Sequence, residues 1–598
     1  MRNGLFKKIA GAAAILLAAL AASVSFASCD RGDPETTDPV QTEPDTSAAE
    51  TAAAIADFTV AEGGEMKCRV VRGVDATDAE ITAAMNIRRA LQNSLPEAKV
   101  DIVDDLTASA SPGPSIIVGR TVLPETSAVL ETIGYGDAVI IPRADCLVVL
   151  SMTDSGMTHL GNKAGELLGL AADKEGNVVF GRDMAYTFRV SAELAGVPVV
   201  DGRLPDRIVP SGNRAYQIYF QGAKPEELDS YVLKLRASGF GEISDRAVGD
   251  NRFTVFTDGS TAVTAYYTAA NKALRIIAEP ESNRCPSDPD NQQTVTTPML
   301  TMIGRKFGTN NTYLDTDANS GYMCFVIRLS DGRFIVVDGG TYDGITSFAA
   351  AIYAKMRDQA PDPNNIVIAA WIFTHSHTDH TGGFVSFAAT YASHVTLQCV
   401  ISNFPSEADF ESAGDSLTEF TRWKGALGSF NSLMQYKAHT GQRFAIGDAT
   451  VEFLYTHEDF VTKTRSVGTV KNNWNNSSLI FSLEIAGQKI MFTGDSQEIP
   501  NNLTANIYGS YLKSDILQVC HHGGIGGTNS LYAAVDPEVA LYTTSDALVP
   551  VYISKWSYNY YLTHSLHVKE YFNSADRITT FALPYHAKGS GFIKTTVN

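Results

Sequence analysis

The sequence predicts a mixed α/β and α+β protein built from several domains, and three observations lead to this prediction. The chain has 598 residues, enough for about three or four domains. Apolar residues make up 44% of it, in short runs typical of strands that alternate with stretches of helical spacing. Eleven of the twelve histidines lie in the last part of the chain, from Met299 to Asn598. We therefore expect the chemistry in a C-terminal domain, preceded by two smaller α/β-type domains.

The N-terminus is typical of a targeting segment. A basic start precedes an apolar stretch from Ile9 to Val24, which is short for a full membrane span. The sequence Phe26-Ala27-Ser28-Cys29 follows and resembles the lipobox of bacterial lipoproteins, with Phe26 in place of the usual leucine. We predict a signal peptide over residues 1–28 and a lipidated Cys29 that anchors the protein to the cell membrane on its extracytoplasmic side. An ordinary secretory signal and an uncleaved anchor helix are the alternatives.

Composition limits the partners. Residues 29–57 are acidic, carry almost no large apolar side chain and are expected to form a disordered tether. The formal net charge of −19 argues against nucleic acid as a partner, because nucleic acid needs a basic face. The seven cysteines include no C-x-x-C pair, so neither a disulfide framework nor a cysteine zinc knuckle is indicated.

Residues 58–198 are predicted to form an α/β domain. Helical spacing covers Ala79 to Ser94 and Thr158 to Leu170. The expected strands are Ser115–Gly119, Ala138–Ile141 and Cys146–Leu150. This pattern resembles the small accessory domain in front of the catalytic barrel of some glycoside hydrolases, including α-glucuronidases. The resemblance implies a glycan as a candidate partner of the N-terminal domains.

Residues 201–280 are predicted to form a small α+β domain, with a strand over Ala215–Phe220 and a helix over Lys224–Ser238. Its further expected strands are Arg252–Phe256, Ala262–Tyr267 and Lys272–Ile277. The polar stretch 281–298 reads as a linker to the last domain, residues 299–598.

The segment His375-Ser376-His377-Thr378-Asp379-His380 points most directly to function. It follows the apolar run Ile366 to Phe373, which is typical of a strand buried on both faces. Imidazole and carboxylate are ligands that zinc and similar divalent ions prefer. Burying these groups without partners would be unfavourable. The sequence therefore predicts a metal site at the end of a buried strand.

Three further motifs end predicted strands or hairpins of the same domain: Asp338-Gly339-Gly340, Thr493-Gly494-Asp495 and His521-His522-Gly523. Taken in order with the histidine cluster, they resemble the metallo-β-lactamase superfamily across most of this domain. The resemblance implies an αββα sandwich with metal ions at one edge of its two sheets. Within the superfamily, the stretch from Asn475 to Gly524 looks most similar to the hydrolase domain of DNA-uptake competence proteins and to phosphorylcholine esterase-type enzymes.

The resemblance also implies the metal ligands. His375 and His377 would bind a first ion, Asp379 and His380 a second, and Asp495 would bridge the two. The expected cofactor is zinc, as one or two ions, with manganese or iron as alternatives.

A late histidine would complete the second site, and we assign this role to His521, with His522 and His564 as the alternatives. A histidine left over would contact the substrate, and either such a histidine or Asp379 would transfer the catalytic proton. One departure concerns the first ion. Many members of the superfamily supply it with a third histidine, where Asn475 stands in this chain.

The ligand set predicts hydrolysis. Two cations a few ångströms apart lower the pKa of a shared water towards about 7, which gives hydroxide at neutral pH. We expect a surface-anchored hydrolase that uses this metal-bound hydroxide on a phosphodiester or ester, in a small molecule or in a cell-surface glycan or polymer. The alternatives are a glycan-binding lipoprotein with a degenerate or structural metal domain, an extracellular nuclease, which the acidic charge disfavours, and β-lactam hydrolysis.

Overall fold

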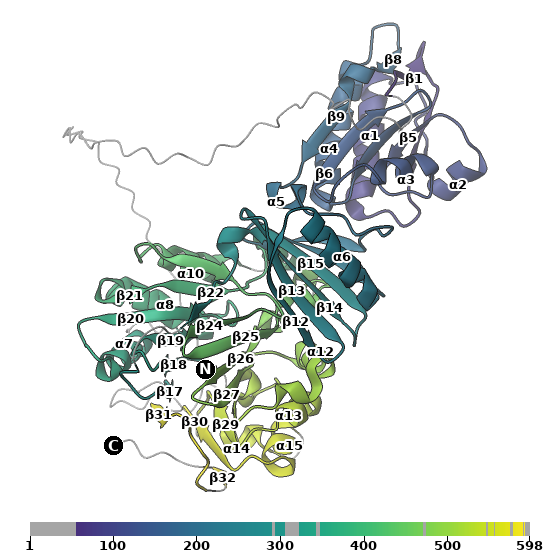
Figure 1. Ribbon diagram of the computed structural model, residues 1–598. Helices are drawn as coiled ribbons and strands as arrows, with labels where there is room; N and C mark the ends of the chain where they lie inside the picture. Colours follow the sequence, from purple (N-terminus) through teal and green to yellow (C-terminus); the bar gives the residue numbers. More distant parts are fainter. Residues whose placement is uncertain are drawn as a thin grey trace, which may run out of the picture. The chain divides into compact units, whose positions relative to one another are not determined.

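The computed structural model describes residues 55–289, 294–304, 322–341, 347–414, 416–469, 474–545, 548–554, 557–574, 578–589 and 591–592. The predicted signal peptide, Cys29 and almost all of the tether lie outside these residues. Within them, no helix is both long and apolar enough to cross a membrane. Five sheets and the helices that cover them confirm a mixed α/β multidomain fold (Figure 1).

The N-terminal domain has a six-stranded sheet in the order β4-β3-β5-β7-β6-β9, with β3, β4, β5 and β7 parallel. Its strands are β3 Arg69–Arg72, β4 Ile102–Asp104, β5 Ser115–Val118, β6 Asp137–Pro142, β7 Cys146–Ser151 and β9 Tyr186–Arg189. A smaller sheet has the order β2-β1-β8, with β1 Phe58–Glu62, β2 Glu65–Met66 and β8 Val178–Phe180. The helices are α1 Asp78–Ser94, α2 Asp105–Ala110, α3 Pro124–Leu130, α4 Asp154–Leu170 and α5 Ala192–Ala195.

Helices α1 and α4 pack on one face of the six-stranded sheet, because each presents a stripe of small and aliphatic side chains to the strands. Ile87 of α1 and Leu160 of α4 share one core with Ile116 and Leu147 of the sheet. A capping box at Thr77 begins α1, since the Thr77 side chain accepts a hydrogen bond from Glu80 N and the Glu80 carboxylate accepts one from Thr77 N.

The middle domain is a six-stranded antiparallel sheet in the order β10-β11-β15-β14-β13-β12, with helix α6, Pro225–Ala237, on one face. Its strands are β10 Arg207–Gly212, β11 Ala215–Gln221, β12 Gly241–Val248, β13 Asn251–Thr257, β14 Thr261–Thr268 and β15 Ala273–Pro280. The sequence did not predict β10 or β12. In β12, only Val248 is buried, and the polar residues Glu242, Ser244, Asp245 and Arg246 leave no regular alternation of apolar residues from which a strand could be predicted.

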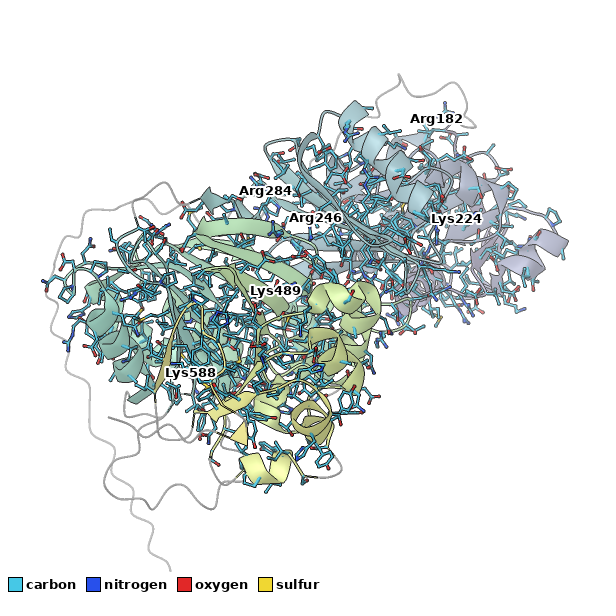
Figure 2. The ribbon with its side chains drawn as sticks, turned by 60° about the horizontal axis from the view of Figure 1, so that its bottom comes forward. Arg182, Lys224, Arg246, Arg284, Lys489 and Lys588 are labelled. Carbon is cyan, nitrogen blue, oxygen red and sulfur yellow. The ribbon has the colours of Figure 1, made fainter. Side chains whose placement is uncertain are left out.

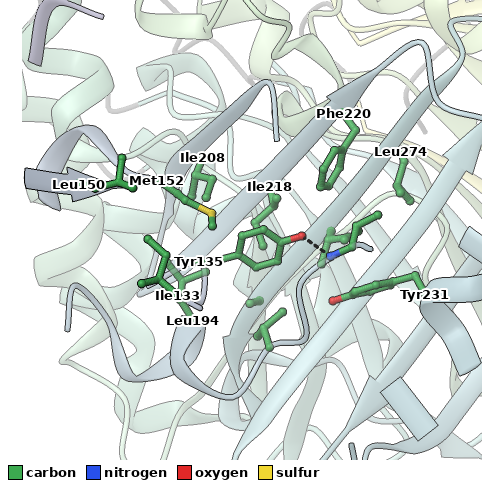
Figure 3. Close-up of a cluster of buried hydrophobic side chains, with 14 of the residues drawn as sticks. Ile133, Tyr135, Leu150, Met152, Leu194, Ile208, Ile218, Phe220, Tyr231 and Leu274 are labelled. Carbon is green, nitrogen blue, oxygen red and sulfur yellow. Dashed lines mark hydrogen bonds between the residues drawn. The ribbon is translucent and has the colours of Figure 1, made fainter. Parts of the chain in front are cut away.

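One hydrophobic core joins the middle domain to the N-terminal domain (Figure 3). Tyr135 lies in it beside Ile133 and Ile218, and its hydroxyl accepts a hydrogen bond of 2.9 Å from Val200 N. Tyr231 of α6 belongs to the same cluster. The two domains are therefore continuous in their packing.

The C-terminal domain contains two larger sheets. The eight-stranded sheet has the order β23-β22-β20-β19-β18-β17-β31, with β21 paired to β20. Its strands are β17 Met299–Met302, β18 Phe325–Arg328, β19 Phe334–Val337, β20 Ile366–Ile372, β21 Val395–Leu397, β22 Cys399–Ser402, β23 Met434–Lys437 and β31 Thr579–Ala582. The predicted strand over the apolar run before the histidine cluster is confirmed as β20, which is buried along nearly all its length.

The second sheet has nine strands in the order β16-β24-β25-β26-β27-β28-β29-β30-β32. They are β16 Asp288–Pro289, β24 Arg443–Gly447, β25 Ala449–Tyr455, β26 Ile480–Ile485, β27 Gln488–Phe492, β28 Ile516–Gln518, β29 Val539–Tyr542, β30 Glu570–Asn573 and β32 Gly591–Phe592. Strand β16 comes from the stretch that the sequence suggested as a linker, and it pairs in parallel with β24.

The two sheets face each other across a shared core, in which Val337 and Ile372 of one sheet pack with Phe481 and Phe492 of the other. Helices α7, α8 and α10 pack on the outer face of the eight-stranded sheet, and α12, α13 and α15 pack with the outer face of the nine-stranded sheet. Their bounds are α7 Ser347–Gln359, α8 Thr378–Tyr391, α10 Thr418–Leu427, α12 Glu498–Tyr508, α13 Asn529–Val535 and α15 Tyr558–Ser565. The remaining helices are α9 Glu407–Ala413, α11 His457–Phe460 and α14 Val549–Tyr552. The predicted αββα layering is confirmed.

The middle sheet also contacts the C-terminal domain through buried polar groups. Arg275 of β15 is fully buried and donates hydrogen bonds to the carbonyls of Glu458, Asp459 and Val461. Arg246 of β12 donates to a carboxylate oxygen of Glu452 at 2.7 Å. Arg246 is labelled in Figure 2.

Candidate metal centre

The histidine cluster lies where β20 passes into α8. The chain leaves the eight-stranded sheet after Ile372, the last residue of β20, and His377 is the N-cap residue of α8. Asp379 and His380 therefore belong to the first turn of a helix rather than to a loop. Gly383 allows α8 to approach the end of β19, since a Cβ there would lie 1.9 Å from Gly339 O.

The other predicted residues also follow strand ends. Asp338 follows β19, Asp495 follows β27, and His521 and His522 follow β28. Because β19 and β20 run parallel, as do β27 and β28, their carboxyl ends meet at one edge of the sandwich.

Asp495 is the centre of the arrangement. Its Oδ1 lies 3.2 Å from His380 Nε2, and its Oδ2 lies 3.2 Å from His522 Nε2 and 3.9 Å from His375 Nε2. The ligand atoms form two groups that share Asp495, each with its atoms within 4.8 Å of one another. One group is Asp379, His380, Asp495 and His522, and the other is His375, His377 and Asp495.

The donor atoms are suited to a cation. Within the described part of the chain, His380 Nε2, His522 Nε2 and Asp495 Oδ1 are buried and have no hydrogen-bond partner, although they lie close together. Burial tends to raise the pKa of Asp495, but His380, His522 and His521 outweigh it and hold this pKa well below its usual range. An ionised carboxylate among imidazole nitrogens is the donor set that binds divalent ions such as zinc. The residues present therefore fit the predicted metal.

Two neighbouring groups orient the imidazoles. Asp338 is fully buried, and its Oδ2 lies 2.7 Å from His380 Nδ1, so the proton of His380 is held on Nδ1 and Nε2 faces Asp495. Thr374 fixes Asp338 by donating from its backbone N and its hydroxyl. Thr543 Oγ1 lies 2.8 Å from His522 Nδ1 and orients that ring in the same way. Thr374 and Thr543 belong to no motif, so sequence analysis did not predict either of them.

The structure brings His522 into the group with Asp379, and leaves His521 beside it. His521 Nε2 lies 3.6 Å from Asp495 Oδ2 and 3.5 Å from Asn475 Nδ2. Both histidines have left-handed backbone conformations, with φ of 50° and 57°. Such backbone is unusual for residues other than glycine, and it is concentrated at functional sites.

The remaining candidate, His564, and three other histidines of the domain lie elsewhere. His564 is exposed on α15, where its ring stacks on Tyr560 at 4.0 Å. His394 is exposed, and His439 and His457 are buried where the C-terminal domain meets the middle sheet. None of these four histidines enters either group of donor atoms.

Comparisons with known proteins agree with this geometry. A family model described as the Metallo-beta-lactamase superfamily matches residues 320–397, which include Asp338 and the histidine cluster. This confirms the predicted superfamily resemblance for that region. A search of curated protein sequences finds no match.

Solved structures show similarity at low identity. The metallo-beta-lactamase fold protein YhfI from Bacillus subtilis is 14% identical, covers 41% of this chain and 85% of its own, and has a TM-score of 0.25. Zn²⁺-bound PqqB from Methylobacterium extorquens is 12% identical, with 48% and 100% covered and a TM-score of 0.28. CmlA, a diiron beta-hydroxylase from Streptomyces venezuelae, is 12% identical, with 49% and 55% covered and a TM-score of 0.29. At these scores the similarity does not extend to activity or substrate. A closer relation to competence proteins or to phosphorylcholine esterases stays a prediction.

Proposed function

We propose that this chain is a metal-dependent hydrolase that acts on a phosphodiester or an ester. The observation that supports this most directly is the convergence of His380 Nε2 and His522 Nε2, both buried and without a hydrogen-bond partner, on the carboxylate of Asp495 at the edge of a two-sheet sandwich. Divalent ions bound there supply water activation and Lewis acidity at neutral pH. Zinc fits the imidazole and carboxylate donors, and manganese or iron are the alternatives.

Different residues of the chain would bind the metal, orient its ligands and exchange protons. His375 and His377 would hold one ion and Asp379, His380 and His522 the other, with Asp495 shared by the two groups of donor atoms. Asp338 keeps His380 oriented. The side chain of Asp379 is 33% exposed, whereas those of Asp495 and His522 are almost fully buried. Asp379 is therefore the carboxylate placed to exchange a proton with solvent.

The test combines metal analysis with hydrolysis of a panel of phosphodiesters, phosphomonoesters, carboxylic esters and a β-lactam. Purified wild type should contain divalent metal and cleave at least one diester or ester, and His377→Ala should lose metal and most of this activity. His394→Ala is the matched control, because His394 is an exposed histidine of the same domain. A protein that neither binds metal nor hydrolyses any member of the panel would refute the proposal.

The location of the enzyme rests on the sequence. A lipidated Cys29 would hold the hydrolase on the outer side of the cell membrane, where glycans and other surface polymers are candidate substrates. Cys29→Ser should move the protein from the membrane fraction to the soluble fraction. An unchanged membrane fraction would contradict lipid anchoring.

A further inference from the structure

A cavity lies beside the metal centre, and neither the motifs nor the metal ligands account for it. Its volume is about 370 Å³, within the range of ~300–1,000 Å³ typical of small-molecule sites. Ser376 and His377 line one side of it, and α9, α10 and Trp474 line the other. Since His377 is a candidate ligand, a molecule in this cavity would have a group next to the metal centre.

The cavity has an aromatic wall. Phe410 of α9, Phe420 of α10 and Trp474 contribute to it. The ring centroids of Phe410 and Trp474 are 4.3 Å apart, and those of Phe410 and Phe420 are 5.6 Å apart. Phe410 and Trp474 are buried, whereas Phe420 is half-buried, so Phe420 is the ring that most presents itself to a ligand. Such a wall favours a ligand with an apolar ring face.

The rim is polar and carries both charges. Ser416 and Thr418 contribute hydroxyls that lie 2.7 Å apart and are hydrogen-bonded to each other, each with capacity for a further bond. Glu419 and Arg422 contribute a carboxylate and a guanidinium three residues apart on α10. Among the described residues, neither Glu419 nor Arg422 forms an ion pair. Together these groups supply several donors and several acceptors around an apolar wall.

A ligand that uses all of these features has a ring with one apolar face and several hydroxyls at its edge. We propose that the cavity binds the glycosyl part of a sugar phosphodiester whose phosphate lies at the metal centre. This inference rests on the proposed function and names its substrate class. A polynucleotide is disfavoured as the ligand. The carboxylate of Glu419 offsets the positive charge of Arg422 at the rim, and the chain carries a net charge of −19, so the described residues of the rim offer no basic surface to a phosphate backbone.

The experiment compares four 4-nitrophenyl phosphodiesters whose second ester group is methyl, cyclohexyl, thymidin-5′-yl or glucos-6-yl. In each reaction water adds across the P–O(aryl) bond and releases 4-nitrophenol and the other phosphate monoester. The glucosyl ester should have the highest kcat/KM, followed by the cyclohexyl ester, which keeps the ring but lacks the hydroxyls. Equal values for the glucosyl and methyl esters would overturn the inference, as would a fastest reaction with the thymidine ester. Failure to cleave any of the four by a protein that hydrolyses another member of the panel would also overturn the inference, whereas failure on the whole panel would count against the proposed function.

Variants test the wall and the rim. Phe420→Leu keeps apolar volume but removes the flat ring, and it should lower kcat/KM for the glucosyl ester by about 3- to 10-fold while changing the methyl ester less than about twofold. Arg422→Gln should likewise lower kcat/KM for the glucosyl ester more than for the methyl ester. Tyr558→Ala is the matched control, since Tyr558 is an exposed aromatic residue on α15. An equal loss on both esters in the Phe420 and Arg422 variants would mean that the cavity is not a sugar site.

Binding provides a readout that does not depend on turnover. Calorimetric titration with glucose 6-phosphate, a product of the glucosyl ester, should give a Kd that rises by about 3- to 10-fold in Phe420→Leu, both in zinc-loaded and in chelator-treated protein. Titration with methyl phosphate should be insensitive to this substitution. A Kd for glucose 6-phosphate that does not change in the variant would overturn the inference.

Discussion

Asp338 decides how His380 faces the metal centre. Its backbone is left-handed, with φ of 54°, and its carboxylate contacts both His380 Nδ1 and Thr374. A residue in this conformation is held there by its surroundings, because the conformation is unfavourable for side chains with a Cβ. The geometry of the donor atoms therefore depends on a residue that does not bind the metal itself.

Asp338→Asn should weaken metal binding without removing a ligand. The amide cannot provide the charge that holds the proton on His380 Nδ1, so we expect an affinity loss of about 10- to 100-fold for one ion. Competition with a fluorescent chelator measures it. Asp358→Asn, an exposed carboxylate on α7, is the control. Equal affinities in wild type and Asp338→Asn would contradict the role given to Asp338.

The neighbouring histidines His521 and His522 should behave differently. His522→Ala removes a donor that lies 3.2 Å from Asp495 and 3.3 Å from Asp379, so the protein should lose about one equivalent of metal at a fixed free concentration. His521→Ala leaves both groups of donor atoms complete and should keep its metal content. Elemental analysis after dialysis distinguishes the two, and the reverse result would make His521 the ligand.

At the scale of elements, the close approach of α8 to the end of β19 sets the position of Asp379 and His380. Gly339 N donates to His380 O, and Gly383 N donates to Gly340 O at 3.0 Å. These contacts leave no space for a side chain at position 383. The helix is thus fixed directly against the loop that carries Asp338.

Gly383→Ala should displace α8. The added methyl would lie 1.9 Å from Gly339 O, so we expect a stability loss of about 1–3 kcal/mol together with weaker metal binding. Gly425→Ala in α10 is the matched control, because no atom lies within 4 Å of its added Cβ and alanine favours a helix. Thermal unfolding and metal titration test both variants, and an unchanged melting temperature for Gly383→Ala would refute the packing argument.

For the molecule as a whole, a buried charge cluster joins the middle sheet to the C-terminal domain. His439 Nε2 lies 2.9 Å from Glu279 of β15, and His439 Nδ1 lies 2.8 Å from Glu458. Burial alone would lower the pKa of His439, but these two carboxylates outweigh it and raise the pKa to about 9. In the unfolded chain a histidine is neutral above about pH 6.5, whereas His439 in the folded protein stays charged at neutral pH.

The cluster should make stability depend on pH. Because the folded pKa of His439 is raised, its contribution is complete below about pH 6.5 and is lost as the pH rises through about 9. The melting temperature of wild type should therefore fall towards that of His439→Gln between pH 7 and 10, over a free-energy range of about 3 kcal/mol at most. His567→Gln, an exposed histidine, is the control. A constant difference between wild type and His439→Gln would show that His439 is not charged in the folded state.

Local pattern predicted much of the fold and of the site. The apolar run before the cluster gave β20, and motif order brought His375, His377, His380 and Asp495 to one edge of the sandwich. Strand β12 was missed because it is an edge strand with one buried residue, and its apolar residues do not alternate regularly with polar ones. The choice between His521 and His522 depends on two left-handed backbone conformations, which no residue type at those positions indicates.

Contacts between residues far apart in the chain could not be predicted from local sequence pattern either. Phe410, Phe420 and Trp474 line one cavity although the last is far from the others in the chain. None of these aromatic residues belongs to a motif, so the sequence alone would place them in the hydrophobic core. One partner of His439, Glu279, lies outside the predicted C-terminal domain, near the end of β15 in the middle sheet.

The buried arginine of β15 has a consequence for biosynthesis. Arg275 leaves the ribosome 183 residues before Glu458, whose carbonyl it will contact. At ~5–20 residues per second, this interval lasts roughly 10 to 40 s. During that time the middle sheet carries a cation on a face that has no lasting partner, so it stays open to water or to a chaperone. Completion of the nascent C-terminal domain is therefore what allows the middle sheet to reach its final state.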